Sequence, residues 1–282
     1  MIIDFHTHTF PDKVAVSAIS KLSQVSHTKP FSDGTAVGLS ASTKASGIDY
    51  SVILPVATSP RQVISINDTA SVINETMKVQ GLLSFGGIHP DYENWRDELT
   101  RISGLGLKGI KIHPVYQRVD LDDLRYLRIL DKAAELDLIV VTHSGIDIGY
   151  PELNHCSPDK ILHAVKQVPA LKLVCAHMGG WKMWNEATEL LSNTNVYLDT
   201  AFSTDSFAAL DDGYHSAEYA RLLDEAQFLE FVKTFGAQRI LFGTDSPWSD
   251  QKDSVAWIQS LPLTHEDKDA ILGENARNLL QL

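Results

Sequence analysis

The chain has 282 residues, of which 44% are hydrophobic and 21% are charged, a balance typical of a globular protein with a sizeable core. Its net charge of -12 argues against nucleic-acid binding, because phosphate backbones attract basic surfaces. No apolar run approaches the roughly 18 to 20 residues that cross a membrane, and the 2 cysteines do not make a disulfide framework. We expect a cytoplasmic protein without a signal peptide that acts on a small molecule and needs neither nucleic acid nor membrane; a homodimer stays open.

Eight short runs rich in β-branched residues recur along the chain, and we interpret each as a buried strand. Most of them end in polar or glycine-rich segments. In chain order they cover residues 1–8, 50–56, 82–90, 107–114, 138–145, 171–180, 195–201 and 239–248.

Amphipathic stretches separate these runs and predict helices. Ile66, Ala70, Ile73 and Met77 share one helical face, and Gly81 stands where such a helix would end. Further apolar stripes lie within residues 124–134 and 229–235, and a helix is predicted to start at Ser157-Pro158 and to end at Pro169.

Eight strand–helix units in about 250 residues match the size and order of a (β/α)8 barrel. A doubly wound sheet usually carries a glycine-rich phosphate loop after its first strand, and FHTHTFPD (5–12) is not one. We therefore predict one α/β domain over residues 1–282 with the TIM-barrel fold. The longer connections 9–34 and 202–222 are candidate lids over the barrel mouth, and 264–282 is a helical finish.

The predicted strand ends carry many polar side chains. Barrel enzymes place their catalytic residues at the C-terminal ends of the strands. The histidines and the aspartate found at these ends here predict a metal site. The side chains at or beside these ends are His6, His8, His89, Lys111, His113, His143, His177 and Asp245.

Four of these side chains suit one metal ion. Alternate residues of a strand share a face, so His6 and His8 point one way, and His143 and Asp245 can turn inward with them. Neutral imidazoles with one carboxylate suit Zn²⁺, and a catalytic zinc keeps a position for water, whose pKa it lowers to about 7. Asp245 could take the proton from that water, and His177 would polarise or protonate the substrate. Each residue also has a structural alternative, such as a helix N-cap for Asp245.

Other strand-end groups leave alternatives open. His89 and His113 precede prolines and serve either loop packing or substrate contact. Three alternatives stay open for Lys111. It is carboxylated and bridges two metal ions, it neutralises a substrate carboxylate as an ammonium group, or it is a solvated lysine at the strand end. Trp181 either recognises the substrate or packs on the rim. Asp4 shares the face of His6, where a buried carboxylate needs a partner, so it either supports the site or makes a structural hydrogen bond.

The chain resembles the amidohydrolase superfamily, and specifically its amidohydrolase-2 branch. The resemblance implies a TIM barrel, one zinc-like ion on His6, His8, His143 and Asp245, and a part for His177 in catalysis. It spans almost the whole chain and rests on IIDFHTH, GLKGIKIHPVYQ, VVTHSG, KLVCAHMGGW, NVYLDTA, ILFGTDSPW and GENARNLLQL.

The resemblance leaves the reaction open. Our first hypothesis is a metal-dependent hydrolase of a small amide, ester or lactone that we expect to carry a carboxylate. The alternative is a non-oxidative decarboxylase or hydratase of an unsaturated or aromatic acid. The third hypothesis is a TatD-like nuclease, which the acidic net charge disfavours, as does Lys111 where that family usually has an acidic ligand.

Overall fold

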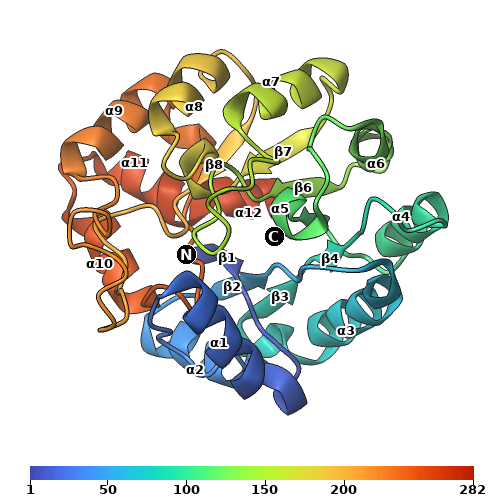
Figure 1. Ribbon diagram of the computed structural model, residues 1–282, viewed down its shortest axis with the longest axis horizontal. Helices are drawn as coiled ribbons and strands as arrows, with labels where there is room; N and C mark the ends of the chain where they lie inside the picture. The colour runs from blue at the N-terminus through green and yellow to red at the C-terminus, as the bar shows by residue number, and fades with distance from the viewer. The chain divides into compact units, whose positions relative to one another are not determined.

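The computed structural model describes residues 1–282 (Figure 1). The chain forms two compact units. The first unit comprises residues 1–53, 80–82 and 199–282, and the second comprises residues 54–79 and 83–198. Strands and helices alternate along the chain, and the paired strands are parallel, as the sequence predicts for an α/β protein.

The first unit contains strands from both ends of the chain. Its elements are β1 (Ile3–Thr7), α1 (Asp12–Ser26), α2 (Ala36–Ala45), β2 (Tyr50–Ile53), α9 (Glu225–Phe235), β9 (Ile240–Leu241), α10 (Gln251–Ser260), α11 (His265–Asp269) and α12 (Asn275–Leu280). β1 pairs in parallel with β2, and on its other side the Phe5 N–H donates to the carbonyl of Phe242 at 2.8 Å. The segment that follows β9 therefore lies beside β1.

The second unit contains the middle of the chain. Its elements are α3 (Val63–Thr76), β4 (Gly86–Gly87), α4 (Trp95–Gly104), β5 (Gly109–Ile112), α5 (Pro114–Gln117), α6 (Leu124–Glu135), β6 (Ile139–Thr142), α7 (Pro158–Gln167), β7 (Lys172–Cys175) and α8 (Trp184–Leu191). β4, β5, β6 and β7 are neighbours in that order, and β7 pairs with β8 (Tyr197–Asp199). All residues of β5 and β6 are buried, as expected for parallel strands covered on both faces.

Several predicted boundaries are wrong. The predicted strand 82–90 is β3 (Leu82–Ser84) and β4, interrupted at Phe85, and the predicted strands 171–180 and 239–248 end early at Cys175 and Leu241. α3 stops at Thr76, because a separate short 3-10 turn (Lys78–Gln80) precedes Gly81. Gly81 has a φ of 82°, so it makes a turn into β3 and does not end the helix.

The two long connections predicted as lids contact each other. Thr28 and Ala209 form an antiparallel bridge, and the Lys29 N–H donates to the carbonyl of Ala208 at 2.7 Å. His27 Nδ1 lies 2.6 Å from the Asp212 carboxylate. The connection after β1 and the connection after β8 are thus joined by backbone and side-chain bonds. No helix of the protein combines the length and apolar character that crossing a membrane requires.

Candidate active site

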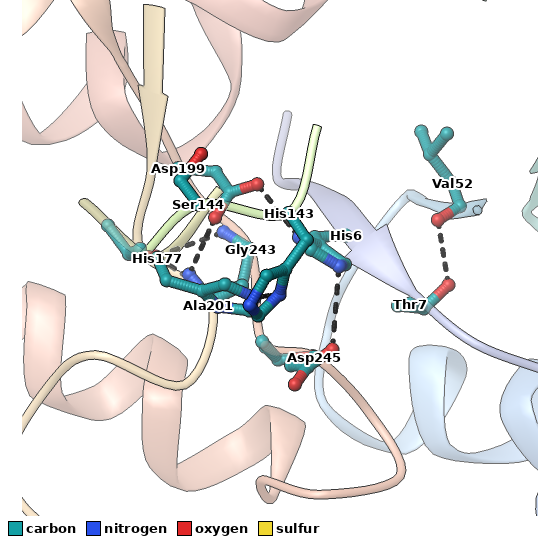
Figure 2. Close-up of polar contacts among 12 residues, drawn as sticks. His6, Thr7, Val52, His143, Ser144, His177, Asp199, Ala201, Gly243 and Asp245 are labelled. Carbon is teal, nitrogen blue, oxygen red and sulfur yellow. Dashed lines mark hydrogen bonds and ion pairs between the residues drawn. The ribbon is translucent and has the colours of Figure 1, made fainter. Parts of the chain in front are cut away.

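His6, His8 and Asp245 meet at the end of β1 in the first unit. Figure 2 marks the contact between His6 and Asp245. The Nε2 atoms of His6 and His8 are 3.1 Å apart, and Asp245 Oδ1 lies 3.4 Å from His6 Nε2 and 3.0 Å from His8 Nε2. Ligand atoms bound about 2.1 Å from one ion lie about 3.0 Å apart in octahedral geometry and about 3.4 Å apart in tetrahedral geometry. The three atoms therefore have the spacing of ligands to a single metal.

Backbone bonds hold these three residues together. The Asp245 N–H donates to the carbonyl of His6 at 2.8 Å, and the His8 N–H donates to the carbonyl of Ser246 at 2.7 Å. Gly243 permits this approach, because a Cβ at that position would lie 2.9 Å from the His6 Cβ. Asp245 itself has a backbone φ of 63°, a conformation that residues other than glycine adopt mainly at constrained sites.

Asp199 orients His6, and the sequence did not single it out. Its Oδ2 lies 2.8 Å from His6 Nδ1, a contact marked in Figure 2. Both side chains are fully buried. A carboxylate accepts, so His6 Nδ1 carries the proton and Nε2 presents a lone pair towards His8 and Asp245. The available signal was an aspartate at the end of a predicted strand, in NVYLDTA.

Asp4, two residues before His6 in β1, is fully buried and bonds the segments that carry the site residues. Its carboxylate accepts from the N–H of His6 at 3.2 Å, the N–H and hydroxyl of Thr244 at 3.0 and 2.6 Å, and Gln251 Nε2 at 2.7 Å. Burial, which outweighs these hydrogen bonds, raises the pKa of Asp4 to about 7. Asp4 therefore ties β1 to the segment that carries Asp245.

In the second unit, His143 and His177 are hydrogen-bonded neighbours. His143 follows β6, His177 follows β7, and His177 Nε2 lies 3.1 Å from His143 Nδ1. The Trp184 indole N–H donates to the carbonyl of His177 at 3.2 Å. His177 has a φ of 59° and Met178 a φ of 54°, so the turn that presents His177 is constrained.

Trp181 joins the loops that carry these two histidines. Its N–H donates to the carbonyl of Ser144 at 2.9 Å, and its carbonyl accepts from the Ile146 N–H at 3.1 Å. The side chain is 2% exposed, so packing accounts for most of its surface. A contact between Trp181 and the substrate stays a prediction.

The remaining predicted substrate residues are also buried. Lys111 in β5 is 1% exposed, which rules out the alternative of a solvated strand-end lysine. His89 accepts the Asp91 N–H on its Nδ1 at 3.1 Å, and burial lowers the pKa of His89 below its usual value. His113 packs against His143, with ring centroids 4.3 Å apart. Substrate contact by Lys111, His89 or His113 is still a prediction.

Two sequence comparisons found similar proteins. A family model described as amidohydrolase matches residues 3–282. Gamma-resorcylate decarboxylase from Polaromonas sp. is 26% identical over 122 residues, which are 40% of this chain and only 35% of that relative's length.

Similar solved structures show the fold. A TIM-barrel protein from Bordetella bronchiseptica has a TM-score of 0.70 and 18% identity over 99% of this chain and 98% of its own. 2,6-Dihydroxybenzoate decarboxylase from Rhizobium has a TM-score of 0.70 and 16% identity over 99% and 98%. A manganese complex of 5-carboxyvanillate decarboxylase from Novosphingobium aromaticivorans has a TM-score of 0.70 and 15% identity over 100% and 96%. The predicted TIM-barrel fold is confirmed.

Proposed function

Since the chain belongs to the amidohydrolase family, we propose that it is a metal-dependent enzyme that removes CO2 from a small aromatic or unsaturated acid without oxidation. The observation that carries the metal dependence is the convergence of His6, His8 and Asp245 within 3.4 Å of one another. The choice of reaction is supported by the decarboxylases among the relatives. These relatives reverse the order of our hypotheses, which placed hydrolysis first.

The donor set fits a resident divalent ion. Two imidazole Nε2 atoms at 3.1 Å cannot both face each other as lone pairs without a proton or a cation between them, and the Asp199 contact leaves His6 Nε2 without a proton. His6, His8 and Asp245 would hold the ion, and His143 stays the predicted fourth ligand. When bound, a divalent ion supplies a Lewis acid that polarises substrate oxygens.

The identity of the ion is part of the proposal. Two histidines and a carboxylate accept zinc, which the sequence predicts, and also manganese, which related decarboxylase structures contain. Elemental analysis of protein purified without added metal separates the two. We expect one ion per chain.

Side chains of this protein would bind the acid and move the proton. Loss of CO2 breaks a carbon–carbon bond and leaves its electron pair on carbon, where a proton must be added. We assign this proton transfer to His177 or Asp245. Lys111, a buried lysine in β5, is the group that we expect to attract the substrate carboxylate, with His89 and Trp181 beside the substrate. The cytoplasmic location and a homodimer stay predictions.

Isotopes test the reaction. Metal-loaded protein is incubated with 2,6-dihydroxybenzoate, 5-carboxyvanillate and a panel of lactones and amides, in deuterium oxide and in ¹⁸O water. A decarboxylase releases CO2 and forms a C–D bond in the product without retaining ¹⁸O. Label from ¹⁸O water in a new carboxylate, with no CO2, would restore the hydrolase hypothesis and leave the metal site intact.

A further inference from the structure

His113 lies in the middle of a stack of three rings in the second unit. Its ring centroid is 3.8 Å from that of Tyr116 at an interplanar angle of 13°, and 4.3 Å from that of His143 at 12°. Both faces of the His113 ring are therefore covered by other rings, and the residue is 7% exposed. This arrangement leaves little of the ring open to a substrate.

The backbone and Nδ1 atom of His113 are fixed by α5. His113 is the N-cap of this helix, its Nδ1 accepts the Tyr116 N–H at 3.4 Å, and Pro114 occupies the first helical position. The His113 N–H donates to Gln117 Oε1 at 3.0 Å, and Gln117 Nε2 donates to the carbonyls of Ala57 and Ile88 at 2.8 and 2.7 Å. Tyr126 also donates its hydroxyl to Gln117. The backbone of His113 is thus tied through Gln117 to Ala57 and Ile88, and the Nδ1 bond to Tyr116 restrains its ring.

The remaining ring nitrogen of His113 faces Asp147. Nε2 lies 3.7 Å from Asp147 Oδ2, and Asp147 Oδ1 accepts the Gly149 N–H at 2.9 Å. His113, His143 and Asp147 are close enough to suggest a second metal site. However, the lone pairs of imidazoles lie in the ring plane, and rings stacked 12° from parallel direct them side by side. The two imidazoles do not converge on one ion.

We propose that His113 is a positioning residue, whose ring fixes the plane of the His143 ring as a metal ligand. This inference rests on the proposed function, in which His143 binds the ion. His143 is held on one face by His113 and at Nδ1 by His177 Nε2 at 3.1 Å, so its other nitrogen has a defined direction. Groups that orient a ligand in this way commonly change metal affinity by about 10- to 100-fold when removed.

Two substitutions distinguish the effect of the His113 ring from the effect of its cap on α5. His113→Phe keeps an aromatic face against His143 and removes the helix cap, whereas His113→Asn keeps a capping side chain and removes the ring. The affinity of each full-length variant for Zn²⁺ and Mn²⁺ is measured by chelator competition, with unfolding curves to verify folding. The control is His163→Ala, whose side chain is 51% exposed.

Positioning predicts that His113→Asn binds metal about tenfold or more weakly, and that His113→Phe stays within about threefold of the natural protein. Unchanged affinity in His113→Asn overturns the proposal, as does an equal loss in both variants. A raised KM with unchanged metal affinity in both variants would assign His113 to substrate binding instead. His143→Ala tests the premise separately: if it retains the ion, the ligand assignment of the proposed function fails, whatever His113 does.

Discussion

His6 Nδ1 and Asp199 Oδ2 lie 2.8 Å apart, although the two residues are separated by 193 positions in the sequence. Both are fully buried, so the carboxylate has to be partnered, and the imidazole N–H is its partner. The bond decides which nitrogen of His6 faces His8 and Asp245. We therefore expect metal binding at the proposed site to depend on Asp199, which is not itself one of the predicted ligands.

Asp199→Asn should weaken metal binding by about 10- to 100-fold, because the amide still accepts a hydrogen bond but no longer carries the charge that favours the required tautomer. Chelator competition with Zn²⁺ measures the effect. Asp211→Asn is the matched control, since the Asp211 side chain is 91% exposed and pairs with Lys29. Equal affinities in the two variants would show that Asp199 does not tune the ligand.

His8→Ala and His177→Asn should fail in different ways. His8→Ala removes a ligand, so metal and activity should be lost together. His177→Asn should retain the ion and lose about 10²- to 10⁴-fold in rate, the usual contribution of a general acid–base group. Metal content and turnover are measured on the same preparations. If His177→Asn also lost its ion, His177 would have to be counted among the ligands.

The sequence predicted those features of the site that depend on local pattern. His6 and His8 share a face because alternate strand residues do, and the end of a barrel strand is where chemistry is expected. Asp245 was found by the same rule. The contact with Asp199 was missed because no local pattern pairs residues so far apart in the chain.

Some strand boundaries were predicted wrongly for a similar reason. The chain breaks the predicted strand 82–90 at Phe85, although the hydrophobic pattern continues across it. The Asn67 side chain bonds both the N–H and the carbonyl of Gly87, at 2.8 and 3.1 Å, so a side chain of α3 bonds the backbone of β4, which also pairs with β5. Propensity and periodicity do not report such tertiary bonds.

Gly145→Ala should destabilise the protein severely. Gly145 has a φ of 84°, and a Cβ there would lie 2.2 Å from the Trp181 nitrogen, where the loops that carry His143 and His177 cross. Backbone strain and the clash together should lower the free energy of unfolding by about 3 kcal/mol or more. Gly104→Ala, at the end of α4 with nothing within 4 Å of the added carbon, is the control and should be nearly neutral. The stabilities of the two variants are compared by their urea unfolding midpoints. Similar midpoints would contradict the close approach of Gly145 to Trp181.

Cys156 should make the stability of the protein fall at alkaline pH. The thiol is fully buried beside Thr142 Oγ1 at 3.4 Å, and burial raises its pKa from 9.0 to about 12. The folded protein therefore keeps a proton that the unfolded chain loses, so this contribution to stability is complete below pH 9 and is lost as the pH rises through about 12.

Between about pH 8 and pH 10.5, the free energy of unfolding of the natural protein should fall by about 2 kcal/mol relative to that of Cys156→Ala, which has no thiol to ionise at this position. Urea unfolding at the two pH values measures this difference, with Cys175→Ala as the control for loss of a buried cysteine. Parallel pH profiles for the natural protein and Cys156→Ala would mean that the thiol ionises as readily in the fold as in the unfolded chain.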